Sequence, residues 1–211
     1  MISQTTELSI IIVTWNAKQF VQECLASLRS YQDDDKTEIV VVDNASSDGT
    51  PDFIEQEFPW VHLIRNDSNL GFAKANNIGI VASIGNYICL VNSDVTIPSG
   101  CLQSLHGYME VNPSVGMVGP QMLCPNGLIG RSYMRFPTVW RSVCNALGLH
   151  RVFPNSVKFS GIMMSDFNNS RTAEVDVLNG WFVMVRRDAV EAVGMLDEQF
   201  FMYGEIGRAH F

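Results

Sequence analysis

The stretch that decides the fold is Leu8-Ser9-Ile10-Ile11-Ile12-Val13, which stops at the polar Thr14-Trp15-Asn16. A continuous β-branched and apolar run of this length is typical of a strand that is covered on both faces, as in the middle of a parallel sheet. Apolar residues then recur at helical spacing, at positions Phe20, Cys24, Leu25 and Leu28. The pattern therefore predicts a strand followed by an amphipathic helix.

The same order repeats along the first half of the chain. Further strands are predicted at residues 38–42, 61–65 and 86–91, and further helices at residues 50–58, 71–84 and 99–111. Strict alternation with short connections implies an α/β fold, a doubly wound and mostly parallel sheet with helices on both faces. Residues 127–169 have no sustained period and are predicted to be rich in loops. Order returns at residues 174–187, a strand or strand pair, and at a helical turn over 188–193.

Composition excludes several kinds of protein. The 211 residues are 46% hydrophobic and 17% charged, which favours one domain with a substantial core. The net charge of -8 would repel a phosphate backbone, and no basic cluster is longer than Arg186-Arg187, so nucleic acid is not expected as a partner. The five cysteines form no CxxC pair, the start of the chain has no basic segment, and its first apolar run is too short to span a bilayer. We therefore expect a cytoplasmic protein.

Polar residues follow four of the predicted strands. They are Thr14 and Asn16, Asp43 and Asn44, residues 66–69, and residues 92–94. Ligands of an open parallel sheet bind beyond the carboxyl ends of its strands, so these residues are expected to line one crevice.

Two of these strand ends carry a carboxylate with two open interpretations each. Asp43 follows four apolar residues and needs donors, which a nucleotide base and ribose hydroxyls would supply. Equally, Asp43 and the residues up to Gly49 are able to form a capped turn. Asp94 is suited to hold a divalent cation against a diphosphate, but it is also an ordinary turn acid ahead of Pro98. The motifs GxGxxG, GxxxxGK[ST] and GxSxG are absent, which removes the usual signals of redox, P-loop and hydrolase chemistry.

Taken in order, these motifs resemble those of family 2 glycosyltransferases, most of all the rhamnosyltransferase-like branch. The matching segments are residues 12–16, 41–50, 69–79, 90–94, 179–187 and 193–205. The resemblance covers residues 8 to 205 and is weakest between 127 and 169. It implies the GT-A type of fold, the nucleotide-diphospho-sugar transferase-like fold. It also implies a half that binds the nucleotide sugar, at 8–119, and an acceptor-side half, at 120–211.

The resemblance implies transfer of a sugar from a nucleoside-diphosphate sugar to a hydroxyl, with inversion, in assembly of a cell-surface polysaccharide. The acceptor would be a glycan or a lipid-linked sugar, which leaves peripheral association with the inner face of the membrane open. The residues implied to bind the nucleotide sugar are Thr14, Asn16, Asp43, Asn44, Ser46, Asp48, Asn69, Gly71, Asn76, Asn92, Ser93 and Asp94. Asp94 would carry Mg or Mn, and Asn92 stands where the family's DxD-like motif has its first acid, which leaves one carboxylate for the metal.

The acceptor side and the catalytic base are also implied by the resemblance. Gly180 and Trp181 would shape the acceptor side, although a packed core aromatic explains Trp181 nearly as well. Family members place the base in an acidic pair after Tyr-Gly, which makes Glu205 the candidate, and the second acid of the pair is missing. Residues 205–211 resemble, apart from Phe211, the translation of a sequencing adapter. We therefore expect that these residues are not native and that the chain is incomplete at its C-terminus.

Three functions remain open at this point. The chain is an inverting glycosyltransferase, a sugar-phosphate nucleotidyltransferase, or a fragment that binds the nucleotide sugar without catalysis. The second is disfavoured because such enzymes have a loop rich in glycine and arginine where this chain has residues 14–18. We expect the parent protein to be a glycosyltransferase, and this chain to bind nucleotide but to transfer sugar poorly or not at all.

Overall fold

The computed structural model describes residues 6–32, 34–124, 126–153, 155–164, 166–167, 169 and 171–202. The predicted base Glu205 lies outside these described residues. By compactness the chain divides into two units, one made of Met1–Val118 with Gly180–Phe211 and the other of Gly119–Asn179. The first unit contains the whole main sheet. The chain returns to this unit at residue 180, after the second unit, and adds the last strand of the sheet there.

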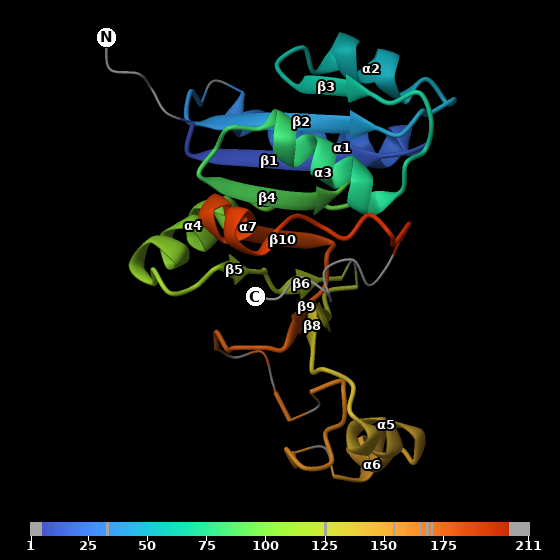
Figure 1. The fold of residues 1–211 in the computed structure, drawn as a ribbon, viewed down its shortest axis with the longest axis vertical. Coiled ribbons are helices and arrows are strands. Elements are labelled where there is room, and N and C mark those ends of the chain that lie inside the picture. The colour runs from blue at the N-terminus through green and yellow to red at the C-terminus, as the bar shows by residue number, and fades with distance from the viewer. Residues whose placement is uncertain are drawn as a thin grey trace. The chain divides into compact units, whose positions relative to one another are not determined.

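The main sheet has six strands in the order β3-β2-β1-β4-β10-β5 (Figure 1). Their bounds are β1 (Leu8–Thr14), β2 (Thr37–Asp43), β3 (His62–Arg65), β4 (Tyr87–Asn92), β5 (Met117–Val118) and β10 (Phe182–Arg186). The first four strands are parallel, and β10 runs antiparallel to both β4 and β5. Because β2 and β3 lie on one side of β1 and β4 lies on the other, the strand order reverses between β1 and β4. This is the topological switch point at which open α/β sheets bind their ligands.

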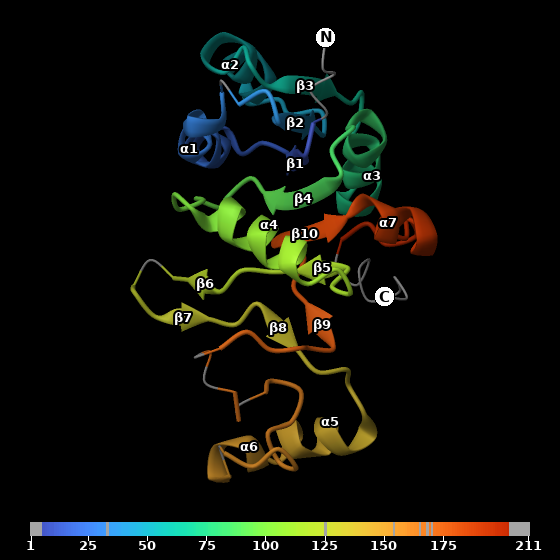
Figure 2. The same cartoon turned by 90° about the vertical axis from the view of Figure 1, so that its left-hand side faces the viewer.

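Helices cover both faces of this sheet. They are α1 (Lys18–Ser27), α2 (Thr50–Glu57), α3 (Phe72–Ala82), α4 (Cys101–Val111) and α7 (Arg187–Val193), with a 3-10 turn, η1, at Arg29–Tyr31. Figure 2 shows α1, α2 and α4 on one face, and α3 and α7 on the other. The predicted doubly wound, mostly parallel sheet with helices on both faces is therefore confirmed.

The alternation of side chains along β1 explains the two covered faces. Ile10 and Ile12 belong to the core under α1 and α4, whereas Ile11 points to the opposite face. There α3 packs so closely that a Cβ on Gly79 would lie 2.4 Å from Cγ2 of Ile11. A glycine in the middle of this helix is thus required by the helix-to-sheet distance.

The prediction that Phe20 belongs to the apolar stripe of α1 is wrong. Phe20 is 56% exposed, and Val21 is fully buried. The buried residues of this segment are Val21, Cys24, Leu25 and Leu28, which have the spacing i, i+3, i+4, i+7. Phe20 lies beside this stripe, since the stripe is already complete without it.

The second unit has its own short elements. They are β6 (Met122–Leu123) paired with β7 (Ile129–Gly130), β8 (Tyr133–Met134) paired with β9 (Val177–Leu178), α5 (Val139–Ala146) and α6 (Leu149–Val152). A two-fold hydrogen-bonded ion pair between Arg135 and Asp166, at 3.0 and 2.9 Å, holds this unit together. The loop-rich prediction for residues 127–169 missed both helices. Two strands, β9 and β10, do lie within the predicted residues 174–187, but they belong to different sheets and do not pair with each other. None of the helices in the described part of the chain has the length and apolar content needed to cross a bilayer.

Candidate functional site

The carboxyl ends of three neighbouring strands bring Thr14, Asp43 and Asn92 together. Thr14 is the register partner of Asp43 in the β1/β2 pair, and Val13, one residue earlier, is the partner of Asn92 in the β1/β4 pair. Trp181 comes immediately before β10, and its carbonyl accepts a hydrogen bond of 2.9 Å from the Asn92 backbone N–H. Residues far apart in the sequence thus share one edge of the sheet at the switch point.

This edge gathers buried polar atoms that have no partner within the described residues. They are Thr14 Oγ1, Asp43 Oδ1, Asn92 Oδ1 and Trp181 Nε1. Trp60 Nε1, Asn145 Oδ1 and His150 Nδ1 are the other such atoms in that part of the chain, and they belong to other elements. Leaving a buried polar group unpaired costs free energy, so proteins satisfy nearly all such groups. One hydroxyl, two acceptor oxygens and one N–H donor come from residues at this strand edge, which makes it the candidate site for a polar ligand.

Both interpretations of Asp43 find support in the structure, each for a different oxygen. Oδ2 accepts a hydrogen bond of 2.9 Å from the Ser46 backbone N–H, which is the predicted turn. Oδ1 is unpaired among the described residues, and the side chain is 1% exposed. The turn therefore fixes the carboxylate and leaves one oxygen for a ligand.

The loops after β1 and β2 are joined to each other. The Asn16 backbone N–H donates to Ser46 Oγ, the Ser47 backbone N–H donates to Asn16 Oδ1, both at 2.8 Å, and Asn44 N–H donates to the Thr14 carbonyl. Asn16 and Ala45 have positive φ values of 48° and 61°. Residues other than glycine adopt such angles rarely and at a cost, and they concentrate at functional sites. This pair of loops is a rigid wall beside Thr14 and Asp43.

Asp48 is engaged within the protein. Its Oδ1 accepts from the backbone N–H and the hydroxyl of Thr50, and its Oδ2 accepts from the Lys18 backbone N–H at 3.2 Å. Partial burial raises the pKa of Asp48, but these hydrogen bonds outweigh it and the pKa lies below its ordinary value. Asp48 thus ties the starts of α1 and α2, and its predicted role in binding nucleotide stays a prediction.

Four amides organise the loop in front of α3. Asn69 Oδ1 accepts from the Gly71 N–H at 3.0 Å, Asn44 Nδ2 donates to the Gly71 carbonyl at 3.2 Å, and Asn66 Nδ2 donates to Asn44 Oδ1. Asn76 Nδ2 donates to the Phe72 carbonyl one turn earlier in α3. The residues predicted to close over the nucleotide are therefore held in place by side chains from the ends of β2 and β3.

Sequence reasoning missed Asn77. Its Nδ2 donates to the Leu196 carbonyl at 2.9 Å and to Glu198 Oε1 at 3.0 Å, and its Oδ1 accepts from the Leu196 N–H. Asn77 is only 4% exposed and joins α3 to the segment after α7. The signal available was a pair of adjacent asparagines inside a helix, where this residue type is disfavoured unless its side chain has a task.

Asn92 is the last residue of β4, Ser93 and Asp94 follow it, and Asp94 is exposed. Burial raises the pKa of the Cys24 thiol to about 12, and the nearby negative charge of Asp94 adds to the rise. The described residues contain no group of three or more His, Cys, Asp or Glu side chains that could hold a metal ion. One carboxylate and the unpaired Asn92 Oδ1 are hard oxygen donors of the kind Mg²⁺ prefers, and such a site is complete only with phosphate oxygens. The donor set fits a cation that arrives with a diphosphate.

Trp181 has features of both interpretations offered for it. Its ring packs against the main hydrophobic core and meets Phe182 edge to face, with centroids 5.8 Å apart. Its Nε1 is buried and unpaired within the described chain, and its backbone carbonyl accepts from the Asn92 N–H. The ring is thus part of the core, while the backbone of Gly180 and Trp181 lies at the candidate ligand edge of β4 and β10.

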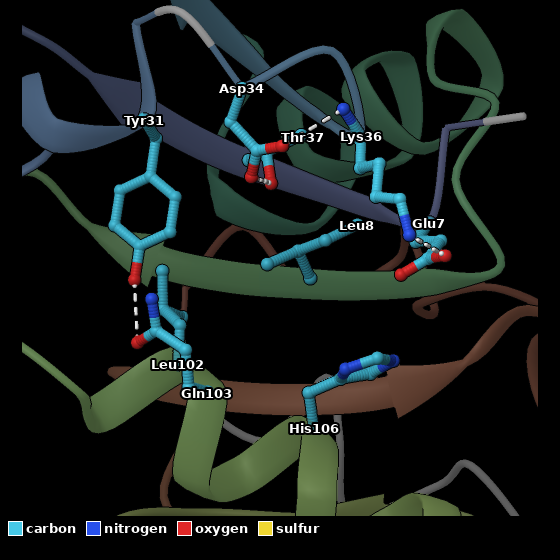
Figure 3. Close-up of a pocket in the computed structure, with 9 residues that line it drawn as sticks. All are labelled: Glu7, Leu8, Tyr31, Asp34, Lys36, Thr37, Leu102, Gln103 and His106. Carbon is cyan, nitrogen blue, oxygen red and sulfur yellow. Dashed lines mark hydrogen bonds and ion pairs between the residues drawn. The ribbon is translucent and has the colours of Figure 1, made fainter. Parts of the chain in front are cut away.

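A cavity of about 180 Å³ lies at the opposite end of the sheet (Figure 3). It is lined by the amino ends of β1 and β2 and by α4, through residues that include Leu8, Tyr31, Thr37, Gln103 and His106. Tyr31 closes one side by donating its hydroxyl to Gln103 at 2.9 Å. None of the sequence-predicted site residues lines this cavity, so it is separate from the candidate site.

The fold and the site together define an α/β protein with a group of unpaired buried polar atoms at its switch point. A family model described as "Glycosyl transferase family 2" matches residues 9–194. The chain belongs to glycosyl transferase family 2.

Named relatives agree with this assignment. The chain is 28% identical over 212 residues to an N-acetylglucosaminyl-diphospho-decaprenol L-rhamnosyltransferase of Mycobacterium tuberculosis. The aligned region covers 95% of this chain and 68% of that protein. It is similar in fold to a mannosyltransferase of Pyrobaculum calidifontis in complex with GDP-Man and Mn2+, with a TM-score of 0.59, 20% identity, and coverage of 93% and 49% of the two chains. It is also similar to S. aureus TarS 1-349 in complex with UDP-GlcNAc, with a TM-score of 0.60, 16% identity, and coverage of 94% and 51%. The predicted GT-A type of fold is thereby confirmed, and the chain spans about half the length of these solved structures.

Proposed function

We propose that this chain binds a nucleoside-diphosphate sugar at the carboxyl ends of β1, β2 and β4. The transfer would be to a hydroxyl of a glycan or lipid-linked acceptor, with inversion, in the assembly of a cell-surface polysaccharide. The observation that carries the proposal is the group of unpaired buried polar atoms of Thr14, Asp43, Asn92 and Trp181 at the switch point. Family membership supplies the class of reaction.

The donor half of the site would be built by residues 8–119. Asp43 Oδ1 would accept hydrogen bonds from the base or the ribose, and Thr14 Oγ1 lies next to it across the β1/β2 pair. The loop held by Asn69 and Asn44 would cover the nucleotide, since these amides fix its path at Gly71. Buried and oriented polar groups recognise such ligands because their hydrogen bonds do not compete with water.

A divalent cation, Mg or Mn, would be held by Asp94 together with Asn92 and the diphosphate. When bound, the cation neutralises the charge that develops on the departing nucleoside diphosphate. The structurally similar mannosyltransferase was solved with GDP-Man and Mn2+, which agrees with this assignment. Ser93 lies between Asn92 and Asp94 in the sequence and would complete the loop around the phosphates.

On the acceptor side, Gly180 and Trp181 would line the approach of the hydroxyl. Inversion requires a general base within hydrogen-bond distance of that hydroxyl. Glu205 remains the candidate by resemblance alone, since it lies outside the described residues. The reaction would take place in the cytoplasm, at the inner face of the membrane where the acceptor is lipid-linked.

A calorimetric titration tests this proposal. The chain is titrated with dTDP-, UDP- and GDP-sugars, with and without Mn²⁺, beside an Asp94→Ala variant. One donor is expected to bind at least tenfold more tightly with Mn²⁺ than without it, a difference of about 1.4 kcal/mol in binding free energy. Asp94→Ala is expected to remove that difference, because Asp94 would hold the cation against the diphosphate. Asp35→Ala is the matched control, since Asp35 is an exposed carboxylate in the turn before β2, at the opposite end of the parallel strands from Asp94.

Two results would count against the proposal. If a well-folded chain binds none of the three nucleotide sugars, the assignment of the site is wrong. If binding is indifferent both to Mn²⁺ and to Asp94→Ala, the role of the cation is wrong and the nucleotide site stands.

A further inference from the structure

The second unit exposes an unusual number of large apolar side chains around α5 and α6. They are Phe136, Val139, Trp140, Val143, Leu147, Val152, Phe153 and Val157, each between 38% and 84% exposed. Single exposed apolar residues are normal on a protein surface, but a group of this size within 22 residues marks an interaction site. We refer to this group as the α5–α6 surface.

Three exposed apolar residues share one side of α5. Val139 and Val143 of the helix and Leu147, its C-cap residue, are spaced four residues apart, so they stack along that side. Cys144, which is fully buried, marks the side that faces the rest of the unit. The helix is therefore strongly amphipathic, with its apolar face turned to solvent instead of to a core.

Aromatic contacts continue this face toward α6. The Trp140 ring lies 6.1 Å from the Phe159 ring, which in turn lies 5.0 Å from the Phe153 ring. Trp140 Nε1 donates to the Lys158 carbonyl, and the Lys158 ammonium lies 5.8 Å from the Phe159 ring centroid. The apolar surface is thus continuous from α5 to α6, and a basic side chain lies at its edge.

The charge of this region is opposite to that of the whole chain. The chain has a net charge of -8, yet no Asp or Glu occurs between Glu110 and Asp166. The basic residues in that interval are Arg131, Arg135, Arg141, Arg151 and Lys158. Two of them have acidic partners, Arg135 in Asp166 and Arg141 in Asp176. Arg151 and Lys158 are exposed and have no ion pair within the described residues.

We propose that the α5–α6 surface docks on an anionic lipid membrane. Exposed Val, Leu, Trp and Phe side chains would enter the boundary between headgroups and acyl chains, while Arg151 and Lys158 would meet the negative headgroups. A second copy of this chain fits the surface less well, because a symmetric contact would bring the same positive charges face to face. The inference deepens the proposed function and rests on it in one respect: a lipid-linked acceptor would be presented at the same membrane.

Sedimentation with lipid vesicles tests this inference. The 211-residue chain is mixed with vesicles of phosphatidylcholine alone, or of an equimolar mixture with phosphatidylglycerol. We expect the chain to sediment with the anionic vesicles, and salt to weaken this binding. The double variant Val139→Asp, Leu147→Asp is expected to bind the anionic vesicles at least about tenfold more weakly, since it places two carboxylates on the inserting face. The double variant Arg151→Gln, Lys158→Gln is expected to lose about tenfold as well, with most of the salt dependence.

The matched control is Val81→Asp with Val111→Asp. These two valines, near the ends of α3 and α4 in the first unit, are 72% and 77% exposed, so the control makes the same change of charge and hydrophobicity elsewhere. It is expected to bind vesicles as the unaltered chain does. Circular dichroism establishes that each variant is folded.

Three outcomes overturn the inference. These are equal binding to both kinds of vesicle, binding to neither kind, and a dimer of the unaltered chain that Val139→Asp, Leu147→Asp converts to monomer. The nucleotide titration separates this inference from the proposed function. A chain that binds vesicles but no nucleotide sugar would refute the proposed function alone, and the reverse result would refute the membrane surface alone.

Discussion

Gly71 and Phe201 are in direct backbone contact. A Cβ on Gly71 would lie 2.6 Å from the carbonyl oxygen of Phe201 and 2.8 Å from its ring carbon Cδ2. The same carbonyl accepts a hydrogen bond of 2.7 Å from the Phe72 N–H. The segment after α7 is therefore attached to the loop that is proposed to cover the nucleotide.

Gly71→Ala is expected to break this contact. The backbone of Gly71 has φ 83° and ψ 176°, a conformation that is essentially restricted to glycine, and the added methyl group would force the Phe201 carbonyl and ring to shift. We expect the free energy of unfolding to fall by about 2 to 4 kcal/mol, as strain and overpacking act together. Urea denaturation measures this loss.

Gly100→Ala is the matched control. Gly100 has nearly the same φ, 82°, but a Cβ there would have nothing within 4 Å. Its substitution is expected to cost about 1 to 2 kcal/mol, the ordinary cost of a left-handed conformation for an L-residue. If both variants lose the same stability, the contact with Phe201 contributes nothing.

The Asn77 side chain is expected to hold the segment after α7 in place. Asn77→Ala removes three hydrogen bonds to Leu196 and Glu198 and takes a side-chain partner from the part-buried N–H and carbonyl of Leu196. We expect a loss of about 2 to 3 kcal/mol in the free energy of unfolding, together with faster hydrogen exchange of residues 194–202. Mass spectrometry of exchanged peptides measures the second effect.

Asn112→Ala provides the comparison for this variant. Among the described residues, the Asn112 amide donates to the Tyr108 carbonyl alone, one turn earlier in α4, so its removal affects only the end of that helix. Exchange in residues 194–202 should be unchanged in Asn112→Ala. An Asn77→Ala variant that exchanges no faster there than the unaltered chain would show that other contacts hold the segment.

The sequence predicts the main sheet well because its strands are covered on both faces. A strand such as β1, buried along nearly its whole length, has to be a continuous apolar run, and the polar residue that ends the run marks its carboxyl end. The site residues Thr14 and Asp43 follow from this rule, since parallel strands end at one edge. Periodicity therefore predicts the fold, and it also predicts which edge of the sheet is the candidate ligand site.

The features that the sequence does not reveal depend on contacts between distant segments. Asn77 became a joining residue only because the segment at Leu196 returns beside α3, which no local pattern indicates. The helix α5 was missed because it has only 8 residues, too few for a sustained apolar period, and it lies among Pro, Gly and Asn. Which oxygen of Asp43 is paired also depends on the turn to Ser46, and not on composition.

Asp43→Asn is expected to separate ligand binding from stability. An amide retains an oxygen that accepts from Ser46 N–H, but it replaces the unpaired Oδ1 acceptor by an NH₂ donor and removes the negative charge. Affinity for the nucleotide sugar should fall by about 1 to 3 kcal/mol. Stability of the free protein should not fall, because an unpaired buried charge is removed. Titration calorimetry and urea denaturation measure the two effects, and a loss of stability without a loss of affinity would favour the turn as the whole role of Asp43.

Asp48→Asn is expected to show the opposite behaviour, because both Asp48 oxygens are used within the protein. The hydrogen bonds from Thr50 and Lys18 stabilise the charged form and hold the pKa of Asp48 below its ordinary value of 3.8. A group whose pKa is lower in the folded state stabilises the fold above the unfolded pKa, and this contribution is lost as pH falls through the folded pKa. We expect Asp48→Asn to cost about 1 kcal/mol at neutral pH, a modest value because solvent screens this exposed carboxylate.

The pH dependence of that difference distinguishes a charged anchor from a neutral one. Urea denaturation of the unaltered chain and of Asp48→Asn should give a constant gap above about pH 5, which narrows below about pH 4 as the carboxylate is protonated. Asp35→Asn serves as the control, since Asp35 is exposed in the turn before β2 and its loss should leave stability nearly unchanged. A gap for Asp48→Asn that persists unchanged to low pH would mean that hydrogen-bond geometry alone ties α1 to α2. The charge of Asp48 would then contribute nothing to the stability of the joined loops beside Asp43.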